Sequence, residues 1–125
     1  MSIQEQFKEQ LGIDLENVLN QMKIPQEVYE KLVKMSIVST QNSLSELEAA
    51  IRQKNWPSFK NITHDLIGVY ANLYIFPLRD LVYKMRHSLD QGDPASQEPM
   101  IRQLFDEFSG RFEKLKVIFN STPTI

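Results

Sequence analysis

Apolar residues recur at intervals of three and four along almost the whole chain, and this spacing limits the possible folds more than any other feature. Residues at these intervals share one side of an α-helix, whereas a half-buried β-strand would alternate apolar and polar residues. No segment of the sequence alternates in that way. The sequence therefore predicts an all-α protein. Its most regular apolar stripe consists of Ile101, Leu104, Phe105, Phe108, Phe112, Leu115 and Phe119.

Capping and helix-breaking residues divide this pattern into separate helices. Ser2 with Glu5 forms a capping box and Gly12 follows as a stop, while Asp14 can cap a second short helix. Longer helices are then predicted over about 25–54, 55–75, 77–91 and 94–120. Gly92 should close the third of these in a left-handed conformation, and the segment 121–123 should end the last.

The joints between the four longer helices are short, which favours antiparallel packing of neighbours. We therefore expect one domain over residues 1–125, an up-and-down antiparallel four-helix bundle from about 25 to 121 after a helical extension of about 1–24. A chain of this size can bury a core without disulfides or metals. The core is expected to include Leu32, Leu47, Leu66, Leu81 and Phe108.

Composition and charge disfavour several classes of function. The net charge is -2 with acidic and basic residues interspersed, so the clustered Lys and Arg typical of nucleic-acid-binding proteins are missing. The sequence has no cysteine, no apolar run of about 20 residues and no signal peptide, so we expect a cytoplasmic protein outside the membrane. It also lacks a Glu-x-x-His pair, a phosphate-binding glycine loop and a kinase signature, which disfavours di-iron and ATP-dependent enzymes.

The predicted helix over 55–75 carries the most informative polar residue, His64. On a helical wheel His64 lies roughly 180° from the middle of the apolar stripe, so its imidazole should face solvent. That stripe consists of Phe59, Ile62, Leu66, Val69 and Leu73. A glycine inside a helix costs about 1 kcal/mol relative to alanine, so Gly68 beside His64 indicates clearance for a docking partner. The rest of this outer face is Lys60, Ala71 and Ile67, the last expected to be an exposed aliphatic that adds apolar docking area.

The residues around His64 resemble the signature of the histidine-containing phosphotransfer (HPt) domain family. That signature is His-x-Leu-Lys-Gly, followed by a small-residue segment and Asn-Leu-Gly. Here the chain reads His64-Asp65-Leu66-Ile67-Gly68 and then Ala71-Asn72-Leu73-Tyr74, and the resemblance extends from about Pro25 to Ile118. The sequence departs from the family at two positions, where the family's lysine is Ile67 and its later glycine is Tyr74.

The resemblance implies a phosphorelay intermediate and not an autonomous enzyme. His64 would accept a phosphoryl group from a receiver-domain aspartate and pass it to another receiver, with Lys60 in place of the missing lysine. The partners would be a response-regulator receiver domain, a hybrid histidine kinase or both. Mg²⁺ would belong to the receiver, so no cofactor or metal site is expected in this chain, which should be a monomer.

Two alternatives stay open at the level of sequence. A phosphotransfer-like bundle could bind a receiver or kinase without being phosphorylated, or the chain could be an unrelated structural bundle. The only other histidine, His87, lies opposite the apolar residues of its helix and is expected to be an ordinary solvated side chain.

Overall fold

The computed structural model describes the backbone of residues 1–120 and the side chains of residues 1–119. Within this range all regular structure is helical, as the apolar spacing predicts, and the predicted end of the last helix at 121–123 lies outside the described residues. The elements in chain order are α1 (Ile3–Gln6), the π-helical turn η1 (Phe7–Leu11), α2 (Leu15–Met22), α3 (Gln26–Arg52), α4 (Trp56–Asn72), α5 (Phe76–Ser88), the 3₁₀ turn η2 (Leu89–Gln91) and α6 (Pro94–Asn120).

The predicted caps form at the starts of the helices. The Ser2 hydroxyl accepts a hydrogen bond from the Glu5 N–H at 3.1 Å, and the Asp14 carboxylate accepts one from the Asn17 N–H at 3.2 Å. Gly12 adopts the left-handed conformation with φ 68°, which terminates the first helical segment. These side chains satisfy backbone groups that a helix end leaves without partners.

Two predicted helix ends are wrong. α4 stops at Asn72, short of the predicted residue 75, because Tyr74 takes the left-handed conformation (φ 59°). The Ile75 N–H then donates to the Tyr70 carbonyl at 2.9 Å in a Schellman turn. Gly92 is not left-handed (φ 159°, ψ -156°), since α5 already ends at Ser88 and a tighter 3₁₀ turn satisfies its last carbonyls.

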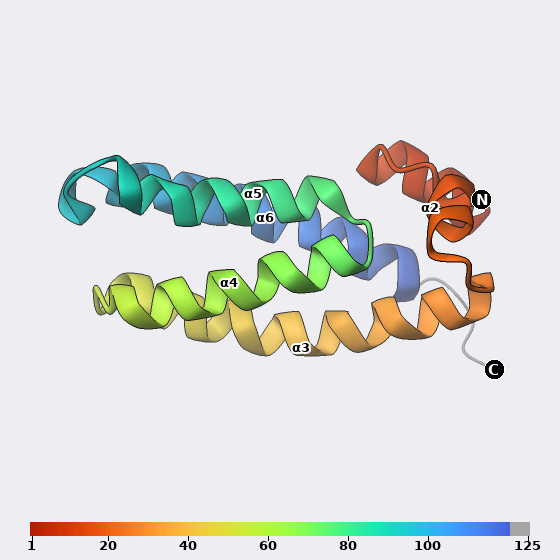
Figure 1. Cartoon of the computed structure of the whole chain (residues 1–125), viewed down its shortest axis with the longest axis horizontal. Helices are drawn as coiled ribbons and strands as arrows, with labels where there is room; N and C mark the ends of the chain where they lie inside the picture. The colour runs from red at the N-terminus through yellow and green to blue at the C-terminus, as the bar shows by residue number, and fades with distance from the viewer. Residues whose placement is uncertain (121–125) are drawn as a thin grey trace.

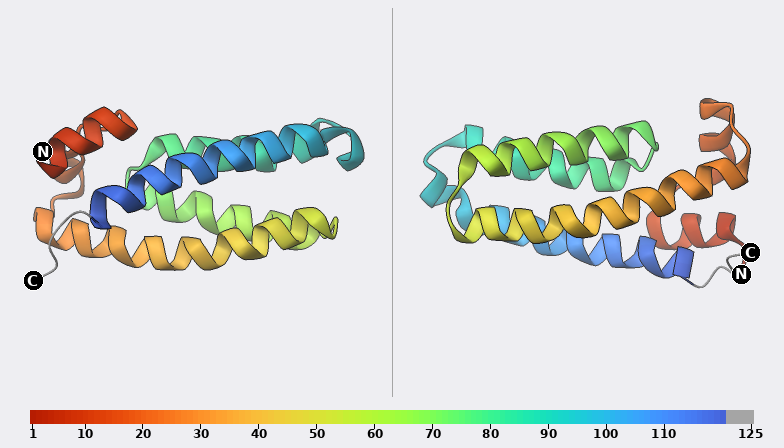
Figure 2. Two further views of the ribbon diagram at one scale, coloured as in Figure 1. Left: turned by 180° about the vertical axis from the view of Figure 1, so that it is seen from behind. Right: turned by 90° about the horizontal axis from the view of Figure 1, so that it is seen from below.

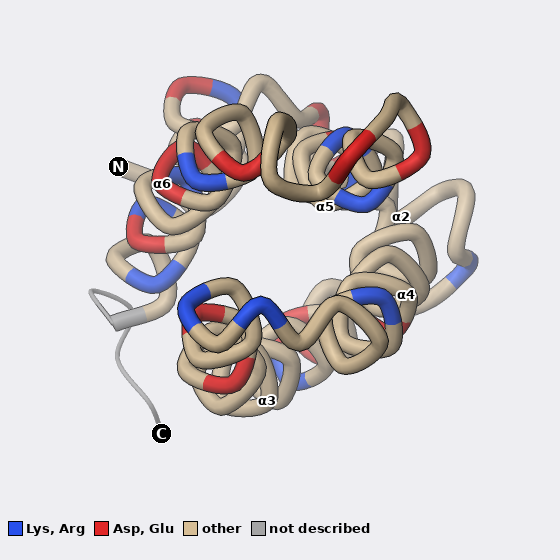
Figure 3. The backbone as a smooth tube through the Cα atoms, turned by 90° about the vertical axis from the view of Figure 1, so that its left-hand side faces the viewer, with Lys and Arg blue, Asp and Glu red and all other residues tan. Residues whose placement is uncertain are grey.

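The long helices α3, α4, α5 and α6 lie side by side, and successive helices run in opposite directions (Figure 1). α3 and α5 each pack against both α4 and α6, so the helices surround a shared interior when viewed along their length (Figure 3). The short helices at the N-terminus sit at one end of this array (Figure 2). None of the helices in the described range is long and apolar enough to cross a bilayer.

Aromatic contacts attach the N-terminal segment to the long helices. Phe7 is fully buried, and its ring lies edge-on to Tyr29 of α3 and to Phe119 of α6, with centroid distances of 6.2 and 5.8 Å. Such edge-to-face pairs contribute about 0.5–1.5 kcal/mol beyond the buried area. The extension therefore shares the core of the longer helices.

The predicted core residues Leu47, Leu66, Leu81 and Phe108 are buried, but the prediction for Leu32 is wrong, since it is 38% exposed. The reason lies in unequal helix lengths, because α3 has 27 residues and α4 has 17. The two helices are antiparallel, so residues equally far from the joint between them are level. By this count the far end of α4, at Asn72, is level with about Ser36 of α3. The side of α3 that carries Leu32 therefore extends beyond the end of α4.

Candidate functional site

The buried stripe of α4 is rotated from the predicted one because it includes polar side chains. Thr63 and Tyr70 are fully buried, whereas Ile62 and Val69 are only half-buried. The Thr63 hydroxyl donates to the Phe59 carbonyl at 2.8 Å, which satisfies it inside the core. At 100° per residue, the centre of the stripe that is buried in the structure lies about 50° around the helix from the centre of the predicted stripe.

His64 is exposed, as predicted. On the side of α4 that faces α3, Ile62 and Ser58 line a groove together with Glu46 of α3 and Gln53, the residue that follows α3. His64 lies two residues, or about 200°, around α4 from Ile62, so it faces the opposite flank, where α5 packs. Within the described part of the chain, its imidazole has no hydrogen bond, ion pair or ring contact.

The other predicted site residues share this flank of α4 with His64. Lys60 is exposed, and Gly68 and Ala71 are half-buried. The prediction that Ile67 is an exposed aliphatic is wrong, because it is half-buried and packs against the core. The rotated stripe explains this burial. Ile67 lies about 70° from the centre of the observed buried stripe, whereas it lies about 120° from the centre of the predicted one.

Gly68 is not required by packing within the chain. A Cβ atom at this position would meet no atom within 4 Å, and the backbone there is helical. The free energy that a glycine costs in a helix interior therefore has no compensation among the described residues. Gly110 of α6 is equally open, so the space at Gly68 permits close approach of a partner but does not by itself require one.

The joint after α4 is held to α3 by a buried hydrogen bond. The Tyr29 hydroxyl donates to the Leu73 carbonyl at 2.7 Å, next to the left-handed Tyr74. A left-handed conformation favours glycine, because a side chain with a Cβ atom is strained there. Tyr74 stands where the HPt signature carries its later glycine, and its backbone has a conformation that favours glycine.

His87 is exposed, as predicted, but its ring has partners. Its Nε2 atom lies 2.8 Å from the side-chain amide nitrogen of Gln91, and its Nδ1 atom lies 3.9 Å from a carboxylate oxygen of Asp90. The ring also stacks on Tyr83, with centroids 5.8 Å apart and an interplanar angle of 10°. Of the two histidines, His64 is thus the one with an unengaged imidazole among the described residues.

Sequence reasoning missed Arg86 of α5. Arg86 is half-buried, and its Nε atom is buried without a hydrogen-bond partner. The sequence contained one signal, because Arg86 lies about 90° from the centre of the apolar stripe of its helix, at the border between core and solvent. That position alone does not distinguish a flank facing α4 from one facing α6.

Among residues 1–119, no three His, Asp or Glu side chains gather closely enough to hold a metal ion. Comparison with known proteins finds no matching family model, no matching curated protein and no matching solved structure.

Proposed function

We propose that this chain is a histidine-containing phosphotransfer protein in which α3, α4, α5 and α6 form the four-helix bundle of that family. His64 accepts a phosphoryl group from the aspartate of one receiver domain and passes it to another. The observation that carries this proposal is the exposed imidazole of His64, which no other described side chain engages. An acceptor must present a free ring nitrogen to a partner, and His64 meets that requirement better than His87.

Two further positions support the proposal. Gly68, one turn after His64, leaves open space on the flank that a receiver would approach. Tyr74 has a left-handed backbone at the place of the family's later glycine. Gly68 matches the family's signature in residue type, whereas Tyr74 carries a side chain at a position where the backbone favours glycine.

The transfer needs only a positioned nucleophile on this chain. A ring nitrogen of neutral His64 attacks the phosphorus of the aspartyl phosphate, and the N–P bond forms as the P–O bond to the carboxylate breaks. The aspartate leaves with the bonding electron pair as a carboxylate, and the imidazole can lose its remaining proton to solvent. Such a loose, in-line transfer depends on alignment and charge neutralisation, and the reverse reaction follows the same path.

The receiver supplies Mg²⁺ and its acidic ligands, so this chain works without a cofactor of its own. It acts as a monomeric carrier in the cytoplasm and has no autonomous enzymatic activity. Its partners are receiver domains, either free or attached to a hybrid histidine kinase.

The alternative is a relative that docks a receiver or kinase without being phosphorylated. Ile67 favours this alternative, because it replaces the family's lysine and packs against the core instead of reaching the His64 imidazole. A lost cation would weaken a charge-assisted contact to the phosphoryl group. Phosphorylation of His64 is therefore the property that separates the two functions.

The test is transfer from a phosphorylated receiver to the wild-type chain, to His64→Gln and to His87→Gln. We expect acid-labile label on the wild type and on His87→Gln, and none on His64→Gln. Circular dichroism should be the same for all three, because both histidines are exposed. Label that persists in His64→Gln would refute the assignment, and receiver binding without any label on the wild type would establish the docking function.

A further inference from the structure

Arg86 of α5 places a positive charge in a partly desolvated position without an anion. It is half-buried, its Nε atom is buried without a hydrogen-bond partner, and among the described residues its guanidinium forms no ion pair. Buried polar groups are nearly always hydrogen-bonded, and a desolvated charge without a partner is unfavourable. Arg86 is therefore poised for an anion that comes from outside the described chain.

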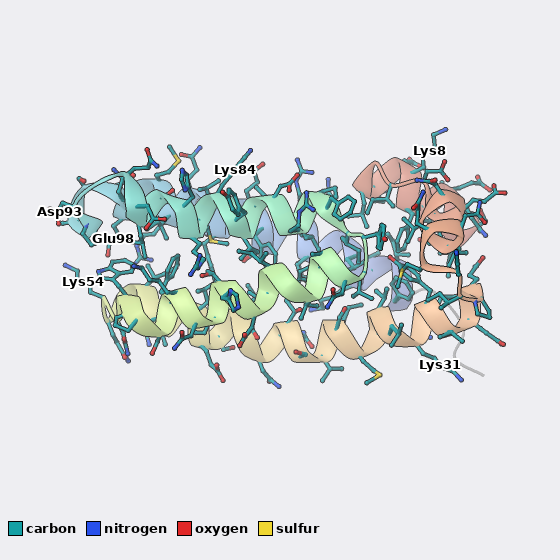
Figure 4. The ribbon with its side chains drawn as sticks, viewed as in Figure 1. Lys8, Lys31, Lys54, Lys84, Asp93 and Glu98 are labelled. Atoms are coloured by element: carbon teal, nitrogen blue, oxygen red, sulfur yellow. The ribbon has the colours of Figure 1, made fainter. Side chains whose placement is uncertain are left out.

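The flank of α5 that carries Arg86 faces α4. Lys84 lies on the edge of α5 that points away from α4 (Figure 4). Arg86 is two residues, or about 200°, further around the helix, so it lies on the opposite edge. Its partial burial fits this position in the seam between α4 and α5, which pack directly on each other.

Arg86 also lies near the level of His64 along the seam. α4 ends at Asn72 and α5 begins at Phe76, so residues equally far from this joint are level in the antiparallel pair. By this count His64 is level with about Lys84. Arg86 is then about 3 Å along the axis from His64, on the side of Lys60. Packed helix axes are about 8–10 Å apart, a gap that two long side chains can bridge.

We propose that Arg86, together with Lys60, binds the phosphoryl group carried by His64 and takes over the role of the family's missing lysine. This inference rests on the proposed function. The planar guanidinium offers paired N–H donors to phosphoryl oxygens, and the phosphoryl group brings nearly two negative charges. The cation then comes from the neighbouring helix, which frees residue 67 of α4 to be the apolar Ile67.

Phosphoramidate, which transfers its phosphoryl group to imidazole and releases ammonia, tests this without a receiver. The labelled fraction is measured by intact mass at fixed phosphoramidate and ammonia concentrations for the wild type, Arg86→Gln and Arg86→Lys. We expect the ratio of labelled to unlabelled protein to fall about tenfold in Arg86→Gln and to recover largely in Arg86→Lys, because charge-assisted contacts have this magnitude.

Arg79→Gln is the matched control. Arg79 lies on the same flank of α5, about two turns away, and is already engaged by Asp80 at 2.8 Å and by the ring of Phe76. Its removal should leave labelling unchanged. Arg86→Met keeps the apolar stem and serves as a second neutral variant if Arg86→Gln folds poorly, which thermal unfolding will show.

A ³¹P NMR titration separates direct contact from a structural effect. A cation on the phosphoryl group favours its dianion, so the last phosphoryl pKa should be higher in Arg86→Gln than in the wild type. Equal labelling and equal ³¹P titration in the wild type, Arg86→Gln and Arg86→Met would overturn this inference and leave the proposed function standing. Absence of label on His64 in the wild type, from phosphoramidate and receiver alike, would overturn both.

Discussion

At the scale of single residues, hydrogen-bonded polar side chains determine how α4 is oriented. Tyr70 is fully buried, and its hydroxyl shares a hydrogen bond of 2.6 Å with Thr40 of α3. Thr63 is buried in the same stripe with its hydroxyl bonded to the backbone. Because these partners remove the cost of burying polar groups, Thr63 and Tyr70 occupy the centre of the stripe and Ile62 and Val69 its edge.

Tyr70 should make the fold sensitive to alkali. Burial raises the pKa of Tyr70 to about 12, although the hydrogen bond to Thr40 lowers it in part. In the unfolded chain the phenol ionises near pH 10, so above that pH the unfolded state loses protons that the folded state retains. This contribution to stability is therefore complete below about pH 10 and is lost as the pH rises to about 12.

Urea unfolding of Tyr70→Phe between pH 7 and pH 11.5 tests this. At pH 7 the variant should be about 1 kcal/mol less stable, since a buried hydrogen bond is lost. Its stability should decline less steeply with alkaline pH than that of the wild type, while some decline remains because burial also raises the pKa of Tyr29. Tyr83→Phe, which changes an exposed residue, is the control. Parallel alkaline profiles for wild type and Tyr70→Phe would contradict the prediction.

At the scale of elements, α4 combines a well-packed inner stripe with a glycine on its outer flank. Gly68→Ala should stabilise the protein by about 1 kcal/mol, because the new methyl group meets no atom within 4 Å and alanine favours the helix. The same substitution should slow phosphoryl transfer from a receiver if the partner approaches His64 closely over this residue. Urea unfolding and transfer kinetics measure the two effects.

Gly110→Ala on α6 is the matched control for Gly68→Ala. A Cβ atom at Gly110 also meets nothing within 4 Å, so this variant should gain similar stability. Gly110 is on another helix and should not affect transfer. If Gly68→Ala and Gly110→Ala transfer phosphate at the same rate, the clearance at Gly68 has no role in docking.

At the scale of the whole molecule, an aromatic cluster connects α6 to α4 and, through Tyr70, to α3. The fully buried ring of Phe108 lies edge-on to Tyr70 at 6.0 Å and stacks parallel to Phe112 at 6.4 Å. We expect Phe108→Ala to lower the free energy of unfolding by roughly 3–5 kcal/mol, because it leaves a cavity between helices that are distant in sequence. Chemical denaturation measures this loss.

Val117→Ala on the same helix is the control for Phe108→Ala. Val117 is 61% exposed, so its truncation should change stability by less than about 0.5 kcal/mol. A loss below about 1 kcal/mol in Phe108→Ala would contradict a shared core between α4 and α6.

The sequence by itself determined the local structure and the choice of candidate acceptor. Apolar spacing and the caps at Ser2 and Asp14 act within a few residues, so they predicted the helix starts closely. Helix ends were less predictable, because Tyr74 takes a left-handed conformation that its side chain disfavours. The exposure of His64 was predictable because it lies on the polar side of α4 for any reasonable position of the stripe centre.

Only the tertiary structure decided which flanks meet and which surfaces stay uncovered. Leu32 is exposed because α4 is shorter than α3. Ile67 is half-buried because burial of Thr63 and Tyr70 turns α4 so that Ile67 lies closer to the core. The antiparallel pairing of α4 and α5 decides which residues of these two helices lie level with one another. Each of these outcomes depends on contacts between residues far apart in the chain, and a periodic pattern within one helix does not specify those contacts.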